Sequence, residues 1–379
     1  MKNRIGIVGG GQLGRMMGFE AKKMGHTVVI LDPTPNSPAG QVTDQQIIAN
    51  YTDKKALREL AKISDVLTVE VEINDEEILH TVLQTIIKKG TAVNPPPQAL
   101  SIIQDKLIQK KFLKKHGIPT PEFMEIKNKN YVLKAAKKYG YPLLLKARTG
   151  AYDGRGNVLI KKETDIDSAL EKFKGRALYI EKFVPFVKEL AIMVARNTKG
   201  EIIDYPVVET VHKKNICHIV YAPAPVDKKI ADKARKLGIK VMKHLKGAGV
   251  FGIEMFVDKK GHVLINEIAP RVHNSGHYTI EACFTSQFEQ HIRAITGMPL
   301  GSTEMKVPAA VMINILGERM GTAEVSGLNK ALKHQGVSVH IYGKSDTKHE
   351  RKMGHLTAVG KNLKDAYNKA IRARKQIKI

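Results

Sequence analysis

The stretch Gly249 to His277, GVFGIEMFVDKKGHVLINEIAPRVHNSGH, decides the fold of this chain. Two apolar runs flank the sequence DKKG at 258–261, and a glycine-containing turn between β-branched and aromatic runs predicts a β-hairpin. Counted outward from Lys260 and Gly261, Glu254 and Glu267 face one another, so both carboxylates should emerge on one side of the strand pair.

Two interpretations of these glutamates are open. They are either solvated on an open sheet face, or a divalent cation bound together with nucleotide phosphates removes their repulsion, and magnesium usually occupies a site with few carboxylates. Glu267 stands in an otherwise apolar run, and Arg271, His273 and Asn274 follow closely. This crowding of hydrogen-bond donors beside two carboxylates favours the metal site.

Composition predicts a soluble globular protein of two or three domains, with 379 residues, 42% of them hydrophobic and 26% charged. No apolar run approaches the length of a membrane span, so we expect a cytoplasmic protein with no membrane partner. The two cysteines, Cys217 and Cys283, have no CxxC partner, so neither a disulfide framework nor a zinc site is expected.

The chain is strongly basic, with 62 Lys and Arg against 37 Asp and Glu. Such a balance fits a nucleic-acid partner, but the lysines are spread over many segments, without interleaved aromatic residues and without any Trp. We therefore expect no dedicated nucleic-acid role. Solvated helix faces, attraction of small anionic substrates, and the lysine-rich surface of heat-adapted proteins are the alternatives.

Residues 1–98 begin as a βαβ unit. The strand RIGIVGG runs into GGGQLG at 9–14, a helix and a second strand that ends at Asp32, which is the pattern of a dinucleotide site. The glycines could instead serve tight packing, or the helix N-terminus could hold another anion. The third strand, DVLTVEVE, should place Glu70 and Glu72 on one face at its carboxyl end, and TAVNPPP, which cannot be helical, should end the domain.

Residues 99–300 carry the densest chemistry. Lys106 begins a helix, and Lys146 lies in the apolar strand YPLLLKAR before the glycine-rich sequence TGAYDGRGN at 149–157. This loop joins two strands, which excludes a Walker A loop and leaves either a flap over phosphates or a plain hairpin. Further on, EKFV at 181–184 ends one strand and Glu189 opens the next, so backbone groups could meet a base and a carboxylate could meet ribose hydroxyls.

Residues 301–379 predict a small β-rich module. VPAAVMINILG and VSVHIYG read as strands, and KNLKDAYNKAIRARKQI reads as a closing amphipathic helix. Lys344 and Arg351 flank the loop sequence that leads into RKMGH. Phosphate binding is one role among several for this charged loop.

In this order, Lys106, Lys146 with its glycine loop, EKFV with Glu189, and Glu254 with Glu267 resemble the ATP-grasp enzymes. PRVHNSGHYTIEAC and ERKMGHLT narrow the resemblance to the N5-carboxyaminoimidazole ribonucleotide synthetase family, over nearly the whole chain. The resemblance implies a mixed α/β and α+β ATP-grasp fold: a Rossmann-like pre-ATP-grasp domain (1–98), an ATP-grasp domain (99–300) and a β-rich C-terminal domain (301–379).

The activity that this resemblance implies belongs to purine biosynthesis. ATP phosphorylates bicarbonate to carboxyphosphate, which carboxylates the exocyclic amine of 5-aminoimidazole ribonucleotide and leaves ADP and phosphate. The cofactors implied are ATP with Mg²⁺, or Mn²⁺ in its place. The family also implies a homodimer and functional coupling to the mutase that uses the product.

The resemblance assigns roles residue by residue. It implies ATP contacts at Lys106, Lys146, Ala151, Tyr152, Asp153, Gly154, Arg155, Gly156, Asn157, Glu181, Lys182, Phe183, Val184, Glu189, His212, Asn266 and Glu267. It implies magnesium ligands at Glu254 and Glu267. Bicarbonate and carboxyphosphate would meet Arg271, His273 and Asn274, with Lys352 as a further catalytic residue, and the ribonucleotide would meet Glu72, Tyr152, Arg155, Lys344 and Arg351.

Three positions depart from the family pattern. The third strand has TVEVEIND where phenylalanines are common, Ala151 replaces a flap glycine, and Ala269 stands where many ATP-grasp enzymes have asparagine. Two other classes remain: another ATP-grasp ligase, such as a formate-using glycinamide ribonucleotide transformylase, and a non-ligase, either an NAD-binding dehydrogenase or a nucleic-acid binder.

Overall fold

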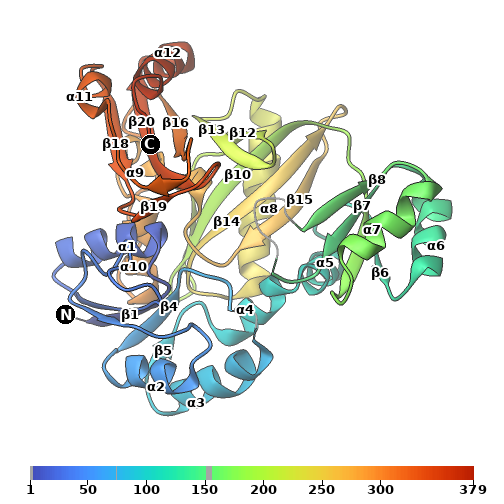
Figure 1. Cartoon of the computed structure of the whole chain (residues 1–379), viewed down its shortest axis with the longest axis horizontal. Helices are drawn as coiled ribbons and strands as arrows, with labels where there is room; N and C mark the ends of the chain where they lie inside the picture. Colours follow the sequence, from blue (N-terminus) through green and yellow to red (C-terminus); the bar gives the residue numbers. More distant parts are fainter. Residues whose placement is uncertain (1–2, 74, 151–155) are drawn as a thin grey trace.

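The computed structural model describes residues 3–73, 75–150 and 156–379. The described strands form a five-stranded, a nine-stranded and a four-stranded sheet and a two-stranded ribbon. In Figure 1 the five-stranded sheet lies at the lower left, the four-stranded sheet at the right, and the long strands β10, β14 and β15 run between them.

The N-terminal sheet is parallel, in the order β3-β2-β1-β4-β5, which confirms the predicted Rossmann-like βαβ opening. The predicted third strand is too long, because β4 ends at Val69 and the chain then turns the Glu70 carboxylate toward the start of α1. Glu70 and Glu72 therefore do not share one face of a strand. The elements are β1 Arg4–Val8, α1 Gln12–Lys23, β2 Thr27–Leu31, β3 Gln45–Ile47, α2 Lys54–Lys62, β4 Val66–Val69, a π-helical turn Ile78–Val82, α3 Leu83–Lys88 and β5 Ala92–Val93.

The proline run after β5 is partly helical, contrary to prediction. Pro97 is the first residue of α4 (Pro97–Gln104). Proline is tolerated there because the N–H group that it lacks would have no partner within the helix. Leu100 of this helix packs in the core of the N-terminal sheet, whereas Ala99 and Ile103 pack in the core of the central sheet. The boundary predicted at residue 98 thus falls inside a helix that both cores share.

The small lobe is a four-stranded sheet in the order β6-β9-β7-β8, with helices α6 and α7 beside it at the right of Figure 1. Helix α5 lies between α4 and β6 in the chain, and its Leu113 packs in the core of the central sheet. The elements are α5 Lys106–Lys115, β6 Phe123–Ile126, α6 Lys129–Tyr139, β7 Leu143–Ala147, β8 Asn157–Ile160, a 3-10 turn Glu163–Asp165, α7 Ile166–Lys172 and β9 Leu178–Lys182.

The central sheet has the order β15-β14-β10-β12-β13-β16-β20-β18, with β11 paired to β10. The predicted C-terminal strands and closing helix are present, but the strands do not form a sheet of their own. Strand β16 is almost entirely buried and pairs with β13 on one side and β20 on the other, so it is an inner strand that joins the C-terminal strands to the central sheet. The loop predicted before RKMGH contains the two-residue strand Asp346–Thr347, and β20 begins after it, at Lys352.

The strands of this sheet and its ribbon are β10 Phe186–Arg196, β11 Ile202–Asp204, β12 Val208–Lys213, β13 Ile216–Ala222, β14 Gly249–Asp258, β15 Val263–Ala269, β16 Ala309–Leu316, β17 Gly321–Thr322, β18 Val337–Ile341, β19 Asp346–Thr347 and β20 Lys352–Gly360. The helices are α8 Lys228–Leu245, a 3-10 turn Asn274–Gly276, α9 Thr279–Ala282, α10 Gln287–Ile295, α11 Leu328–Ala331 and α12 Leu363–Arg374.

The hairpin of β14 and β15 confirms the central prediction, since Glu254 pairs with Glu267. The pairing of the residues between these glutamates and the turn differs from the pairing expected by counting outward from the turn. Val257 pairs with Val263 and Met255 with Ile265, and a bulge at Asn266 then brings Glu267 opposite Glu254. An unbroken ladder would have placed Asn266 there, so the bulge is what joins the two carboxylates.

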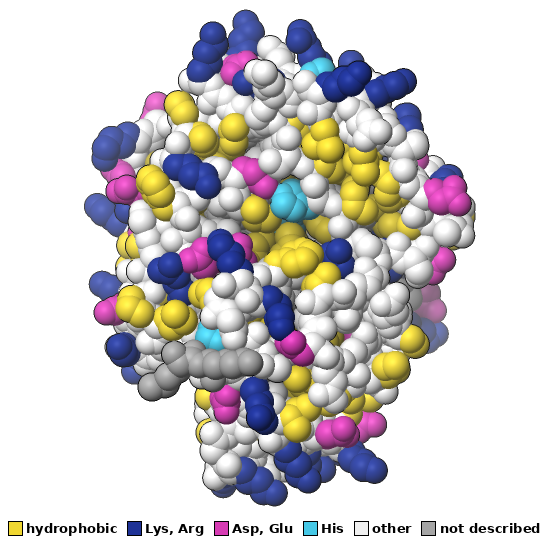
Figure 2. Space-filling model, turned by 90° about the vertical axis from the view of Figure 1, so that its left-hand side faces the viewer, with side chains coloured by type: hydrophobic (Ala, Val, Ile, Leu, Met, Phe, Trp, Pro, Cys, Tyr) yellow, Lys and Arg dark blue, Asp and Glu magenta, His cyan; other side chains and the backbone are white. Residues whose placement is uncertain are grey.

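The surface carries charged side chains of both signs. On the face drawn in Figure 2, Lys and Arg side chains are dispersed among acidic and hydrophobic ones. Cys217 and Cys283 are both buried thiols. Within residues 3–73, 75–150 and 156–379, no helix has the length and apolarity needed to cross a membrane.

Candidate active site

Lys106 is placed by a helix cap. The Asp105 carboxylate accepts the backbone N–H groups of Leu107 and Ile108 at 2.9 and 3.1 Å, so α5 begins at Lys106. The Lys106 ammonium lies 2.9 Å from Glu267 Oε2. The first predicted ATP lysine and the second predicted metal ligand are therefore in direct contact.

A fully buried charge cluster lies below this contact. Glu181 accepts from Lys110 at 2.9 Å and from Lys146 at 3.2 Å, and the exposed fractions of these three side chains are 3%, 1% and 5%. Burial alone would raise the pKa of Glu181, but the two lysines outweigh it and lower that pKa to about 2. Burial lowers the pKa of Lys110 to about 8, because it outweighs the attraction of Glu181. The Glu181 side chain thus forms ion pairs with two lysines. The prediction that backbone groups of residues 181–184 meet a base concerns other atoms of the same segment.

Sequence reasoning missed Lys110. It also donates to the backbone carbonyl of Asn266 at 2.8 Å, which ties the hairpin bulge to α5. The available signal was spacing, since residues four apart on a helix share a face and Lys110 follows Lys106 by four.

The facing carboxylates of the hairpin are electrostatically unequal. Burial, and next the charge of Glu267, raise the pKa of Glu254. Burial opposes ionisation of Glu267 too, but Lys106 and Lys146 outweigh it and lower its pKa. Among the described residues, no group of three or more His, Cys, Asp or Glu side chains could hold a metal ion by itself. A cation here would need ligand oxygens as well as the two glutamates.

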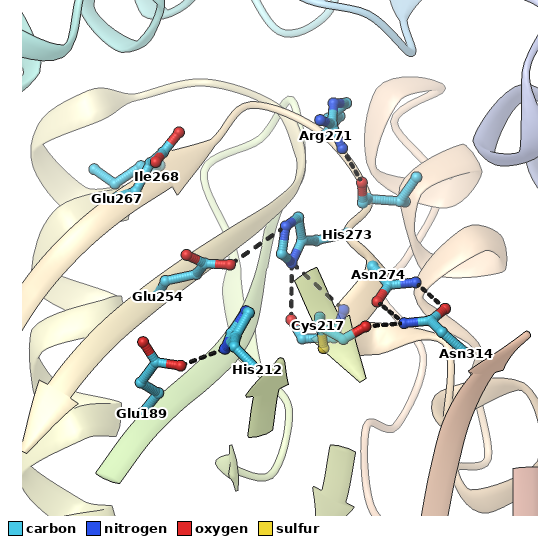
Figure 3. A network of polar contacts seen from close by, with 12 residues as sticks. Glu189, His212, Cys217, Glu254, Glu267, Ile268, Arg271, His273, Asn274 and Asn314 are labelled. Carbon is cyan, nitrogen blue, oxygen red and sulfur yellow. Dashed lines mark hydrogen bonds and ion pairs between the residues drawn. The ribbon is translucent and has the colours of Figure 1, made fainter. Parts of the chain in front are cut away.

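Glu189 and His212 lie beside Glu254 on the neighbouring strands, and their side chains are in direct contact (Figure 3). Burial lowers the pKa of His212, but the contact with Glu189 outweighs it and raises that pKa. The prediction that Glu189 opens its strand is wrong: β10 begins at Phe186, and a bulge before Lys188 lets the ladder start earlier.

His273 reaches toward Glu254 from the segment after β15 (Figure 3). Its Nδ1 lies 2.9 Å from Ser275 Oγ, and its Nε2 lies 3.6 Å from Glu254 Oε1. Burial, and then the charges of Arg271 and Lys352, lower the pKa of His273 to about 3. The imidazole is therefore neutral near pH 7, and its contact with Glu254 is not an ion pair.

Arg271 and Glu72, which are far apart in the sequence, meet at this site. Glu72 Oε1 accepts from Arg271 Nε at 3.1 Å and from Nη2 at 2.7 Å. Arg271, which was predicted to bind carboxyphosphate, is thus hydrogen-bonded to Glu72, which was predicted to bind the ribonucleotide.

Asn274 forms a reciprocal amide pair with Asn314 of β16, at 2.9 and 2.7 Å, and Asn314 also donates to Cys217 O at 2.8 Å. Sequence reasoning missed Asn314, although a lone amide in the buried strand AAVMINIL was a signal that it has a polar partner.

The predicted basic residues of the C-terminal region lie together. Lys344 donates to Lys352 O at 2.7 Å, and Arg351 Nη1 donates to Asp346 O at 2.6 Å. The Lys352 charge also lowers the pKa of His273, after burial and Arg271.

The other predicted residues lie on the small lobe. Asn157 pairs with Lys146 across β7 and β8, next to Gly156. Lys182 ends β9, and Phe183 and Val184 form the link to β10. Ala151, Tyr152, Asp153, Gly154 and Arg155 lie outside the described residues.

Comparison with known proteins identifies the family. Three family models match: a ribonucleotide synthetase preATP-grasp domain over residues 1–104, an ATP-grasp domain over 111–288, and a phosphoribosylaminoimidazole carboxylase C-terminal domain over 310–369. The N5-carboxyaminoimidazole ribonucleotide synthase of Bacillus subtilis is 40% identical over 353 residues, which is 93% of this chain and 90% of that one. The chain belongs to the N5-carboxyaminoimidazole ribonucleotide synthase family. Members of this family are ATP-grasp ligases.

Two further comparisons extend this result. The phosphoribosylaminoimidazole carboxylase of Candida albicans is 44% identical over 371 residues, or 96% of this chain, but the chain spans only 65% of that relative's length. The N5-carboxyaminoimidazole synthase of Aspergillus clavatus, solved with ADP and 5-aminoimidazole ribonucleotide, is 38% identical with a TM-score of 0.90, covering 99% of each chain. The predicted ATP-grasp fold class is confirmed.

Proposed function

We propose that this chain uses ATP to carboxylate 5-aminoimidazole ribonucleotide with bicarbonate, giving N5-carboxyaminoimidazole ribonucleotide, ADP and phosphate in purine biosynthesis. The observation that carries the proposal is the contact between Arg271 and Glu72. It joins the hairpin, where ATP and bicarbonate would react, to the edge of the N-terminal sheet, where an acceptor would lie.

The reaction explains why a site without a covalent nucleophile suffices. Bicarbonate is a poor electrophile, and transfer of the γ-phosphoryl group from ATP turns one of its oxygens into a leaving group. Such transfer needs positioning and charge stabilisation above all. Lys106 and Lys146 supply positive charge, Arg271 orients bicarbonate, and the neutral His273 offers a hydrogen bond without adding charge.

Glu254 and Glu267 are the residues that would hold Mg²⁺, or Mn²⁺ in its place. The fit rests on the pairing of Glu254 with Glu267 across the hairpin, because a cation would offset the repulsion between the two carboxylates. When bound, the ion would neutralise charge on the phosphate oxygens. Lys344 and Arg351 are proposed to hold the 5′-phosphate of the ribonucleotide. A homodimer, a cytoplasmic location and coupling to the mutase remain predictions.

The test is incorporation of labelled bicarbonate, measured together with phosphate release, in degassed buffer with Mg-ATP and 5-aminoimidazole ribonucleotide. We expect phosphate release to require the ribonucleotide, label to enter the product, and both to be lost in Glu267→Gln. ATP turnover that depends on formate or an amino-acid acceptor, without label incorporation, would overturn the proposal and assign another ATP-grasp ligase.

A further inference from the structure

The glycine-rich turn at residues 9–14 already holds an acidic side chain of the protein itself. Burial raises the pKa of Glu70 to about 7, because it outweighs the hydrogen bonds from Gly11 and Leu13. Glu70 Oε2 accepts from Gly11 N at 2.6 Å, and Oε1 accepts from Leu13 N at 3.1 Å. The Glu70 residue is only 6% exposed. In nucleotide-binding βαβ units this helix N-terminus meets a phosphate, and here a carboxylate takes that place.

The glycines of the turn fit this carboxylate closely. A Cβ added to Gly11 would lie 2.4 Å from Glu70 Oε1, and one added to Gly14 would lie 2.8 Å from Oε2. Asp32, the expected ribose ligand of a dinucleotide site, instead accepts from Gly10 N at 2.7 Å. These contacts argue against the NAD-binding alternative.

Glu70 is also connected to the candidate active site. Its N–H donates to Val8 O at 2.8 Å, so both its backbone and its side chain are anchored where β4 ends. Two residues later, Glu72 holds Arg271 at 2.7 Å. Glu70 therefore fixes the chain two residues before Glu72, which contacts Arg271.

We propose that Glu70 is a positioning residue: its carboxyl group, held at the start of α1, fixes the turn that carries Glu72 and so positions Glu72 for the ribonucleotide. This inference rests on the proposed function. It predicts that loss of the anchor weakens ribonucleotide binding while the ATP half of the site is unchanged.

The test is steady-state kinetics of the full chain for Glu70→Gln, which keeps the side-chain shape and replaces the carboxyl group with an amide. We expect the KM for 5-aminoimidazole ribonucleotide to rise roughly tenfold, as expected for disturbing two buried hydrogen bonds, with the KM for ATP within about twofold of wild type. Gly11→Ala, which crowds the carboxyl group, should reproduce the effect with the Glu70 side chain kept. Asp53→Asn is the matched control, since Asp53 caps α2 in the same sheet domain and should leave both KM values unchanged.

A double variant separates positioning from a merely structural role. If Glu70 acts through Glu72, then Glu70→Gln combined with Glu72→Gln should raise the ribonucleotide KM no further than Glu72→Gln alone. The inference would be overturned if the two substitutions raised the ribonucleotide KM by factors that multiply in the double variant. It would also be overturned if Glu70→Gln lowered the Tm and left the ribonucleotide KM at the wild-type value. Failure of the proposed function looks different, because the wild-type enzyme would then show no ribonucleotide-dependent turnover.

Discussion

The glycine-rich turn and the acidic hairpin of β14 and β15 both have the sequence pattern of a site for a phosphorylated ligand, yet their charges are arranged differently. In the turn, Glu70 accepts the N–H groups at the start of α1. In the hairpin, Glu254 faces Glu267, and burial and this second charge raise its pKa. Donors that already have a protein acceptor gain little from a ligand, whereas two like charges that face one another gain from a cation.

The largest effect should come from Glu181, the carboxylate that the protein already satisfies with two lysines. Glu181→Gln leaves Lys110 and Lys146 buried without an opposite charge, so the free energy of unfolding should fall by about 3–5 kcal/mol in urea denaturation. The lowered pKa, about 2 against an ordinary value of 4.5, gives a pH dependence as well. Its stabilisation is present above about pH 4.5 and is lost as the pH falls toward 2.

Glu267→Gln is the comparison for this stability measurement. The Glu267 side chain is 37% exposed and contacts one lysine, so its loss should cost much less stability than that of Glu181. Equal decreases in the free energy of unfolding for the two variants would contradict the distinction between Glu181, which the protein pairs with two lysines, and Glu267, which is proposed to bind a cation.

The next effect concerns turnover. Glu254→Gln removes one of the two facing charges, and we expect kcat to fall by about 10²-fold or more, because the proposed cation site loses a ligand. The Tm should not fall, since the variant also relieves the repulsion from Glu267. Glu125→Gln, at a surface ion pair of β6, serves as the control and should keep wild-type turnover. A Glu254→Gln enzyme with wild-type turnover would remove the hairpin from the mechanism.

The smallest effect is a pH dependence of cation binding. Glu254 must be ionised to bind a cation, and its pKa is raised by burial and then by Glu267. The increase in Tm that Mg-ADP gives should therefore shrink as the pH falls toward the ordinary carboxyl pKa of 4.5. The underlying binding free energy should fall by at most about 1.4 kcal/mol per pH unit. Thermal shift assays of wild type and Glu254→Gln test this, and the same slope in both would assign the titration to another group.

Local patterns predicted much of the fold. Alternating apolar residues around DKKG gave the hairpin, and a strand followed by GGGQLG and a helix gave the parallel N-terminal sheet. These features depend on residues close together in the sequence, where periodicity and turn chemistry decide the outcome.

The missed features depend on contacts between distant segments. No local pattern places a bulge at Asn266, yet that bulge brings Glu267 opposite Glu254. Likewise, Glu70 meets the start of α1 and Asn314 meets Asn274 only after the sheets have assembled. Local periodicity carries no information about such pairs.

The most direct test of the contrast between the two regions is a crystal structure of the chain with Mn²⁺ and ADP. We predict an anomalous peak for manganese between Glu254 and Glu267, with the nucleotide beside Lys106 and Lys146 and the Glu70 carboxylate still at the start of α1. Manganese elsewhere, or nucleotide phosphates at Gly9–Gly14 with Glu70 displaced, would contradict it.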